Sequence, residues 1–166
     1  LVTGGHGIVA PIIGPSEYHF AYSERLAGFQ SEIAQIAPQI ALRQTNIAAD
    51  DDACAMQATL TLLEQVPELA GIYAITPGYA GVCQALIQTG RAQDVRLILH
   101  DEITTNLHYL KDGVVDFVIG QDAEMQGALP LSLLADFIQL RQRPAKAHFF
   151  TDIRVLLKYN IDNLLQ

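Results

Sequence analysis

Short apolar runs alternate with longer amphipathic segments along almost the whole chain. This alternation is typical of βαβ units, in which a helix connects two parallel strands. The expected strands cover 1–3, 40–45, 71–76, 95–100, 114–119 and a C-terminal stretch within 148–159. The expected helices cover about 17–36, 51–66, 79–89, 104–111 and 122–141. The sequence therefore predicts an α/β fold with an open parallel sheet flanked by helices.

The first and the last long helix each carry an apolar stripe at the helical period. The two stripes comprise Tyr18, Tyr22, Leu26, Phe29, Ile33 and Ile36, and then Met125, Leu129, Leu133, Phe137 and Leu140. Such a stripe marks the face of a helix that packs on a core. Pro130 lies inside the second stripe, where proline removes a backbone N–H and crowds the preceding turn. We therefore expect a kink or a late helix start near Pro130.

Composition and charge disfavour several classes of protein. The chain has 10 Lys plus Arg against 18 Asp plus Glu, a net charge of −8, which disfavours a nucleic-acid-binding surface. Hydrophobic residues make up 50% of the 166 residues, which is typical of one folded domain. No apolar run approaches the roughly 18 to 20 residues that span a bilayer, so we expect no membrane segment.

The chain lacks the usual sequence signals of catalysis, cofactor binding and metal binding. Cys54 and Cys83 are too few for a disulfide scaffold or a zinc site, and we expect both to be buried. The five histidines form no metal-binding pair. The run 50–52 is all aspartate, but it precedes a helix, where such residues cap the backbone. No G-x-S-x-G, P-loop or G-x-G-x-x-G motif occurs. We expect a non-enzymatic protein without metal or cofactor.

Polar or glycine-rich segments follow four of the expected strands. They cover 3–6, 76–79, 100–102 and 120–122. In an open parallel sheet, ligands bind outside the carboxyl ends of the strands. Any one of these segments is explained equally well as a loop or a helix N-cap. Taken together they favour a small-molecule site at one edge of the sheet.

Arg25 lies between Tyr22 and Phe29 on the apolar stripe of the first helix. A guanidinium near an apolar interface needs an acceptor. That acceptor belongs either to a structural ion pair, or to a ligand hydroxyl or carboxylate. A third alternative is an arginine whose head group reaches water along the helix surface.

Four segments, in this order and spacing, resemble the lactose/galactose-repressor (LacI/GalR) family. They are Glu24–Phe29 (ERLAGF), Pro67–Tyr73 (PELAGIY), Asp112–Asp122 (DGVVDFVIGQD) and Asp152–Ile161 (DIRVLLKYNI), the last of which is similar to the final strand of those repressors. The resemblance covers nearly the whole chain. It is shared in part with sugar-binding periplasmic proteins of the same type I fold.

The resemblance implies one part of a two-lobed effector-binding domain, with the ligand between the lobes. Residues 1–120 then form the C-terminal lobe, about 121–145 cross into the N-terminal lobe, and about 146–166 are the return strand and tail. The helix-turn-helix DNA-binding domain and most of the N-terminal lobe are expected upstream of this chain. The start at Leu1, without a methionine, agrees with a piece of a longer protein.

The resemblance also implies ligand-binding residues. Arg25 matches the arginine that contacts the ligand in the family, Asp101 matches the acidic residue after the fourth strand, and Gln121 matches the glutamine at the crossover. Thr76 follows Ile75, where sugar repressors usually have an Asn-Asp pair, and we expect Thr76 and Tyr79 to line the same site. The expected ligand is a sugar or a sugar derivative.

The resulting hypothesis is the effector-sensing domain of a cytoplasmic LacI/GalR-type transcriptional regulator. Binding of the metabolite would close the lobes and alter binding to operator DNA, which the missing N-terminal domain would contact. The alternative is a sugar-binding protein of an ABC transporter or chemoreceptor system. We also expect a homodimer through the helix at 79–88 and the segment 104–111, because that helix carries more apolar surface than one sheet face needs.

Overall fold

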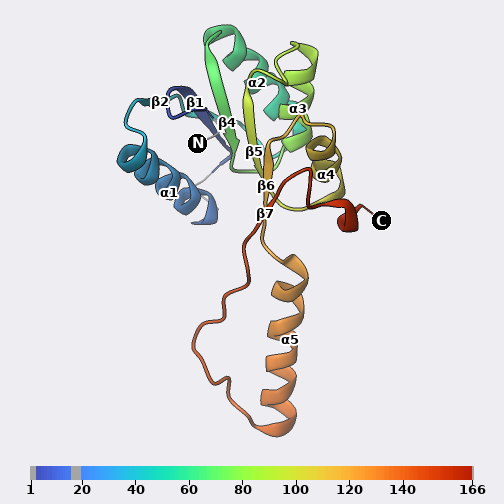
Figure 1. Cartoon of the computed structure of the whole chain (residues 1–166). Coiled ribbons are helices and arrows are strands. Elements are labelled where there is room, and N and C mark those ends of the chain that lie inside the picture. Colours follow the sequence, from blue (N-terminus) through green and yellow to red (C-terminus); the bar gives the residue numbers. More distant parts are fainter. Residues whose placement is uncertain (1–2, 16–19, 166) are drawn as a thin grey trace.

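The computed structural model describes residues 3–15 and 20–165. The described chain divides into a head, residues 3–15, 20–120 and 154–165, and an arm, residues 121–153, that projects from it (Figure 1). The described strands are β1 (Gly7–Ile13), β2 (Ile40–Leu42), β3 (Thr45–Asn46), β4 (Leu69–Ala74), β5 (Arg96–His100), β6 (Phe117–Gly120) and β7 (Arg154–Leu156). They form one sheet in the order β2-β1-β4-β5-β6-β7, with β3 also pairing with β1. All pairings are parallel except β6 with β7, which confirms the predicted fold class.

The start of the sheet differs from the prediction. The first strand is β1, whereas of the segment 1–3 only Thr3 is among the described residues, and it lies in a turn. Pro11 explains the error, because proline lacks the N–H of a central strand and is normally excluded from one. Here Pro11 pairs with Tyr73 of β4. The glycine-rich segment 3–6 therefore precedes a strand and does not lie at the carboxyl edge.

Helices cover both faces of the sheet. They are α1 (Phe20–Ile36), α2 (Asp52–Gln65), α3 (Tyr79–Gln88) and α4 (Thr104–Lys111) in the head, and α5 (Ala123–Leu140) in the arm. Alternate residues of β1 serve two layers: Val9 packs with Ile33 of α1, and Ala10 belongs to the larger core that α2, α3 and α4 cover. Figure 1 shows α1 apart from α2, α3 and α4. The layers therefore hold the strand ends in fixed positions.

Helix α3 does not have the spare apolar surface expected of it. Its residues Tyr79, Val82, Cys83 and Leu86 are buried inside the head, and Ile87 is 51% exposed. The reason is that α3 packs on α2 as well as on the sheet. A Cβ on Gly81 would overlap the backbone oxygen of Asp52, so the two helices meet at van der Waals distance. Of the two cysteines expected to be buried, Cys83 is buried and Cys54 is half-buried.

β1 and β4 lie side by side, but the next strand along the chain after β1 lies on one side of this pair, and the next strand after β4 lies on the other side. The strand order therefore reverses between β1 and β4. Such a reversal opens a crevice beyond the carboxyl ends of the two strands. There the backbone N–H of Gly14 donates to Oγ1 of Thr76 at 3.0 Å. A Cβ on Gly14 would overlap the carboxylate of Asp50, so glycine allows three segments to meet at this point.

The aspartate run at 50–52 is engaged in local hydrogen bonds. Asp51 caps α2 by accepting from the backbone N–H of Cys54 at 2.8 Å, which confirms the predicted capping role. Asp52 accepts from the backbone N–H of Gly81 at 3.2 Å. In the described residues, no three His, Cys, Asp or Glu side chains are grouped so as to hold a metal ion.

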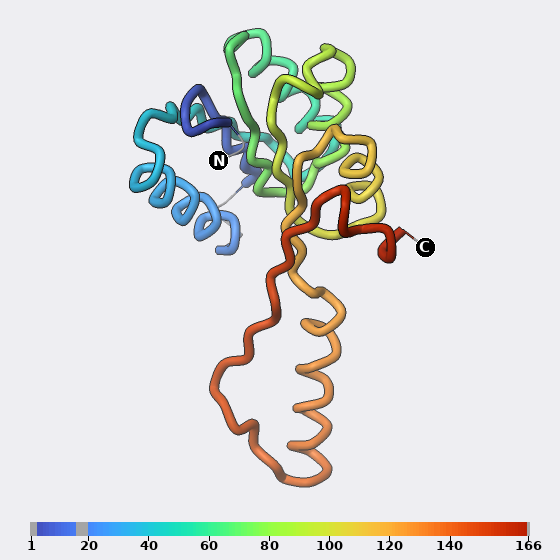
Figure 2. Tube along the Cα trace, viewed as in Figure 1, coloured from blue at the N-terminus to red at the C-terminus, as the bar shows by residue number. Residues whose placement is uncertain are grey.

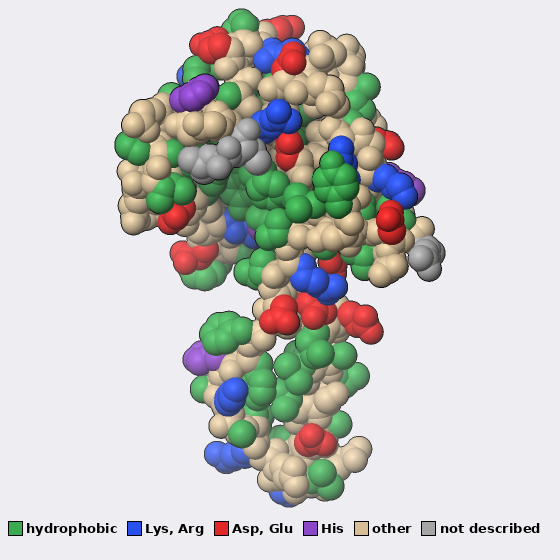
Figure 3. Space-filling view, in the orientation of Figure 1, with side chains coloured by type: hydrophobic (Ala, Val, Ile, Leu, Met, Phe, Trp, Pro, Cys, Tyr) green, Lys and Arg blue, Asp and Glu red, His purple; other side chains and the backbone are tan. Residues whose placement is uncertain are grey.

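The arm has no core of its own. Helix α5 starts at Ala123 and runs through Pro130, so the predicted late start does not occur, and none of its residues is buried. The returning segment 141–153 has neither helix nor strand, and the strand expected within 148–159 is only β7. Figure 2 shows the arm as a separate projection, and Figure 3 shows apolar side chains on its surface. The large exposed apolar residues of the arm are Met125, Leu131, Leu134, Phe137, Ile138, Leu140, Phe149, Phe150 and Ile153.

The predicted apolar stripes are therefore only partly buried. In α1, Ile33 is buried, Ile36 is 55% exposed, and Tyr18 lies outside the described residues. In α5 the whole stripe faces outward or is half-buried. Within the described residues, no helix is long and apolar enough to cross a bilayer.

Candidate ligand-binding cleft

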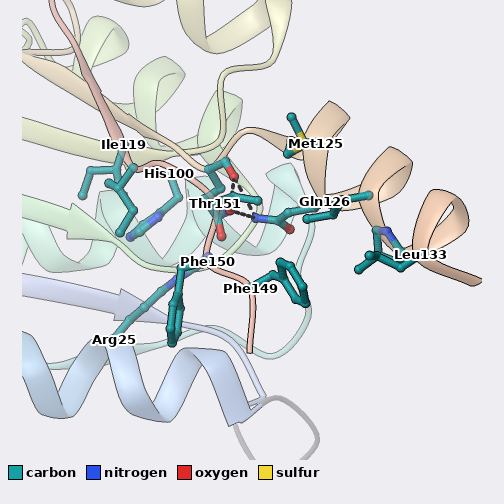
Figure 4. Close-up of a pocket in the computed structure, with 13 residues that line it drawn as sticks. Arg25, His100, Ile119, Met125, Gln126, Leu133, Phe149, Phe150 and Thr151 are labelled. Atoms are coloured by element: carbon teal, nitrogen blue, oxygen red, sulfur yellow. Dashed lines mark hydrogen bonds between the residues drawn. The ribbon is translucent and has the colours of Figure 1, made fainter. Parts of the chain in front are cut away.

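A cleft of about 650 Å³ lies where the arm leaves the head (Figure 4). Its polar lining comes from Arg25 of α1, His100 of β5, Gln121, and Gln126 of α5. The rest of its wall is mainly apolar and comes from β6 and from both sides of the arm. That part comprises Ile119, Met125, Leu129, Pro130, Leu133, Phe149, Phe150, Thr151 and Ile153. A few polar groups facing an apolar wall are the usual composition of a small-molecule site.

Arg25 occupies the predicted place between α1 and the sheet edge. Its Nη1 donates to the carbonyl oxygen of Ile75, directly after β4, at 3.0 Å. This is its single hydrogen bond among the described residues, although a guanidinium has five N–H donors. The bond to Ile75 fixes the side chain, and the remaining donors are free to bind an acceptor in the cleft.

Asp101 is the centre of a polar network at the end of β5. Its φ of 69° is in the left-handed region, which a non-glycine residue rarely adopts without support. The support is a bond from its N–H to the oxygen of Ile119 at 2.9 Å, and one from Asn106 Nδ2 to its carbonyl at 2.9 Å. Its carboxylate accepts from Gln121 Nε2 and, at 3.0 Å, from the hydroxyl of Tyr79. The network joins three of the predicted ligand residues, Tyr79, Asp101 and Gln121, by hydrogen bonds.

Tyr79 is a fixed donor in this network. Burial is the main cause that raises the pKa of its phenol well above the ordinary value, and the neighbouring Asp101 raises it further. The phenol therefore stays protonated, and its O–H group donates a hydrogen bond to the carboxylate of Asp101. Tyr22 behaves similarly on the other side of the crevice: burial and its 2.9 Å bond to Asp50 raise the pKa of Tyr22 to about 12.

Gln121 lies at the junction between head and arm, which is called the hinge below for its position in the chain. Besides its side-chain bond to Asp101, its carbonyl oxygen accepts from Gln126 Nε2 at 2.7 Å and from Thr151 Oγ1 at 3.2 Å. Gln126 and Thr151 are themselves bonded at 3.2 Å, which ties the outgoing chain to the returning chain (Figure 4). Arg154 also pairs with Glu102 at 3.1 Å and with Asp122 at 3.5 Å. The hinge is thus tied to the loop that carries Asp101.

The five predicted ligand residues lie in three places. Arg25 and Gln121 line the cleft. Tyr79 and Asp101 line a neighbouring hollow of about 500 Å³, which the run 50–52 also borders. Thr76 is 2% exposed, lines neither space and accepts the N–H of Gly14. The bond between Asp101 and Gln121 joins the two spaces. Ligand contact by all five residues stays a prediction.

Two sets of residues in the cleft were not among those predicted. His100 is 5% exposed and accepts or donates a 2.7 Å hydrogen bond between its Nε2 and the hydroxyl of Tyr73. Burial, and then the nearby Arg25, lower the pKa of His100 to about 4, so the ring is neutral at pH 7. The aromatic pair Phe149 and Phe150 forms part of the arm wall. Their position within a predicted strand concealed this role, whereas the adjacency of His100 to Asp101 was an available signal.

The arrangement is suited to binding. Arg25, Gln121 and His100 offer hydrogen-bonding groups, and the aromatic and aliphatic wall offers an apolar surface. A ligand that carries hydroxyls on one side and C–H groups on another matches such a site.

Solved structures of sugar-binding proteins share this fold. A D-allose-bound periplasmic solute-binding protein of an ABC transporter from Actinobacillus succinogenes aligns with a TM-score of 0.86 and 23% identity over 97% of this chain and 55% of its own. A sugar-binding protein of an ABC transporter from Bacillus halodurans gives 0.84 and 26% over 96% and 58%. An arabinose-binding protein from Geobacillus stearothermophilus gives 0.83 and 25% over 96% and 57%. This chain spans a little over half the length of each.

Curated protein sequences give no significant match. The family model described as "Periplasmic binding protein domain" matches residues 4–142, which include most of the head and all of α5. The chain therefore belongs to the periplasmic binding protein domain family.

Proposed function

We propose that this chain is part of a receptor for a sugar or sugar derivative, and that the receptor is the solute-binding protein of an ABC transporter. The observation that carries the proposal is the cleft itself, which Arg25 and Gln121 line together with the phenylalanines at 149 and 150. Sugar hydroxyls suit the polar side, and the C–H faces of a sugar ring suit the aromatic side. Two solved neighbours hold D-allose and D-tagatopyranose.

In this proposal the head is the C-terminal lobe and the arm belongs to a second lobe. Residues 1–120 and the return strand then form one wall of the site, and about 121–145 cross into the other lobe. Support comes from the exposed apolar residues of α5, since a folded protein rarely leaves so many uncovered. The role is binding without chemical conversion of the ligand.

The effector domain of a LacI/GalR-type regulator is the second candidate. Its support is the ordered set of sequence segments around Arg25, Ala70 and Gln121. A regulator would act in the cytoplasm, on operator DNA, whereas a transporter receptor would act outside the cytoplasmic membrane. The gene sequence upstream of Leu1 distinguishes the two: a helix-turn-helix favours the regulator, and a secretion signal favours the receptor.

A homodimer is a separate proposal. Because most apolar residues of α3 are buried, the interface would rest on the remaining exposed surface of α3 and α4, including Ile87. Sedimentation of the full-length protein tests it, with a mass of two chains expected and a single-chain mass at micromolar concentration counting against it.

Isothermal titration of the full-length protein tests the sugar proposal. D-allose, D-tagatose and D-arabinose are the probes, because solved neighbours hold these sugars. Saturable heat with at least one sugar is expected, and Arg25→Ala should weaken the binding by roughly 1.5 to 3 kcal/mol. Arg43→Ala is the matched control, since Arg43 is exposed and bonds Gln65 far from the cleft. A protein that binds no sugar in a wider panel of aldoses and ketoses would contradict the proposal.

A further inference from the structure

Three charged side chains meet at the hinge. Nη2 of Arg154, in β7, lies 3.1 Å from a carboxylate oxygen of Glu102 and 3.5 Å from one of Asp122. Glu102 belongs to the loop that follows β5, and Asp122 is the N-cap residue of α5. One guanidinium therefore connects the head, the chain that enters the arm and the chain that returns from it.

Each acidic residue of this charged cluster directly follows a residue of the polar network in the site. Glu102 follows Asp101, and Asp122 follows Gln121. The cluster, through Arg154, therefore joins the same two segments that the hydrogen bond between Asp101 and Gln121 joins. Of the described residues that line the cleft and the neighbouring hollow, none belongs to the charged cluster. An effect of the cluster on ligand binding must therefore act through other residues.

Asp122 is a residue whose backbone needs support. Its φ of 53° is in the left-handed region, which a non-glycine residue rarely adopts. Its Oδ1 accepts from the backbone N–H of Met125 at 3.2 Å, and the same oxygen pairs with Arg154. Because α5 begins at the next residue, the contacts that hold Asp122 also hold the direction in which the arm leaves the head.

Gly120 makes room for the cluster. It is the last residue of β6, and it lies opposite Arg154 in the antiparallel pairing with β7. A Cβ on Gly120 would lie 2.6 Å from Oε2 of Glu102 and 3.7 Å from Cβ of Arg154. The carboxylate of Glu102 thus occupies the space that a side chain would need. An alanine at position 120 would displace this carboxylate, which is the end of a flexible side chain, while leaving every charge in the molecule.

We propose that Arg154 is a positioning residue of the sugar site, and that its pairs with Glu102 and Asp122 hold the arm wall of the cleft at a fixed orientation to the head. The three side chains are 43%, 22% and 25% exposed, and ion pairs with such exposure add little to the stability of a fold. The expected effect is therefore on the orientation of the arm. This inference rests on the proposed function, because the site that Arg154 positions is the sugar site.

Titration of full-length variants with D-allose, D-tagatose and D-arabinose measures the effect on affinity. Arg154→Gln should weaken binding about three- to tenfold, because the arm wall is then held in several orientations. Arg154→Lys keeps the positive charge and should stay within about twofold of wild type.

Arg96→Gln is the matched control for Arg154→Gln. Arg96 pairs with Asp116 at 3.2 Å, and these side chains are 46% and 24% exposed, but both residues lie in the head. The control should lower the thermal midpoint about as much as Arg154→Gln does, while binding sugar as the wild type does. Equal losses of affinity in the two variants would overturn the proposal, since Arg154 would then act only through general stability.

Distances between spin labels test the same proposal without a sugar. Labels on Gln57→Cys in α2 and on Gln142→Cys after α5 report the orientation of the arm, since both positions are exposed. Cys54→Ser removes the half-buried native thiol. The distance distribution should be broader in Arg154→Gln than in the wild type, and it should be unchanged in Arg96→Gln. An unchanged distribution in Arg154→Gln would overturn the proposal.

Gly120→Ala tests the cluster without removing a charge. By displacing the Glu102 carboxylate it should broaden the distance distribution and weaken sugar binding in the same direction as Arg154→Gln. Glu102→Gln keeps the size of the side chain and tests the same pair if Gly120→Ala fails to fold. Wild-type distances in Glu102→Gln would contradict the role of this pair.

The outcomes separate two failures. If the wild type binds no sugar, the proposed function fails and the positioning role of Arg154 falls with it. If the wild type binds a sugar and Arg154→Gln binds it equally well, the proposed function stands and only the inference about Arg154 is wrong.

Discussion

The head buries its apolar side chains between layers, whereas the arm leaves them exposed. In the head, strands such as β5 are sandwiched between layers, and residues such as Leu97 and Leu99 are fully buried. In the arm, α5 has 18 residues of which none is buried, and Leu131 is 69% exposed. The two regions have similar apolar patterns in the sequence. The difference teaches that the sequence of an amphipathic helix shows which face has to be covered, but does not show which part of the protein covers it.

The cleft lies at the boundary between these regions, and this placement explains its one-sided character. Arg25 and His100 come from the rigid head, while Phe149 and Phe150 come from the uncovered arm. Phe150 is 92% exposed. The head therefore holds its ligand-facing groups in place, whereas the positions of the groups on the arm depend on what packs around the arm.

The largest expected effect is loss of sugar binding by this chain alone. A small-molecule pocket normally buries most of its ligand, and here only the head, the hinge and an uncovered arm are present. Water competes for each hydrogen bond on the open side. We expect no measurable heat when residues 1–166 are titrated with a sugar that the full-length protein binds. Equal affinity of the two would show that one lobe is a complete receptor.

Core truncation in the head should produce the next largest effect. Leu97 of β5 is 0% exposed, so Leu97→Ala leaves a cavity and should lower the free energy of unfolding by roughly 2 to 5 kcal/mol. Urea unfolding monitored by circular dichroism measures it. A change below about 1 kcal/mol would mean that the core of the head is less tightly packed than its burial indicates.

Much of the fold could be predicted because the head obeys local rules. Helices α2, α3 and α4 start and end within two residues of the predicted limits, since caps and turns such as Asp51 and Gly113 are strong local signals. β1 was missed because Pro11 breaks the pattern of a strand. The exposure of α5 could not be predicted, because periodicity identifies an apolar face without showing whether anything covers it.

The site was predictable where strand ends carry polar side chains. Arg25 and Gln121 were found on helix periodicity and family resemblance, and both line the cleft. His100 belongs to the polar segment 100–102 at the end of a predicted strand, but neither spacing nor the family resemblance singled it out as a ligand residue. Its Nδ1 has no hydrogen bond among the described residues, which is a property of three-dimensional packing that no spacing in the sequence encodes.

Loss of the Arg25 side chain should weaken ligand binding more than it weakens the fold. In the full-length protein, Arg25→Ala should reduce sugar affinity by roughly 1.5 to 3 kcal/mol, the usual value of a charge-assisted hydrogen bond. The thermal midpoint should change little, because Arg25 is half-buried and bonds a single carbonyl in the head. Calorimetry compares wild type, Arg25→Ala and the control Arg43→Ala. Equal affinity of all three would remove Arg25 from the site.

A smaller effect is expected in the pH dependence of stability. The pKa of His100 is about 4 in the folded head, below its ordinary value of 6.5, so between these values the unfolded chain binds a proton that the folded chain does not. The free energy of unfolding should therefore fall as the pH drops from 6.5 towards 4. Charged or titratable groups facing the ring are Arg25, Asp101 and Tyr73. Urea unfolding at pH 7.5 and 5.5 measures the effect. The free energy of unfolding should differ less between the two pH values in His100→Phe than in the wild type, and an equal difference in both proteins would contradict this.

The smallest effect, near zero, is expected for Leu131→Ala in this chain, and it tests the comparison most sharply. Leu131 is 69% exposed on α5, so truncation removes little buried surface and should change the free energy of unfolding by less than about 0.5 kcal/mol. In the full-length protein the same substitution should cost roughly 1 to 3 kcal/mol if a second lobe covers α5. Leu97→Ala is the matched control, because its cost should be similar in both lengths. A Leu131→Ala effect that stays near zero in the full-length protein would show that the arm is exposed in the complete molecule as well.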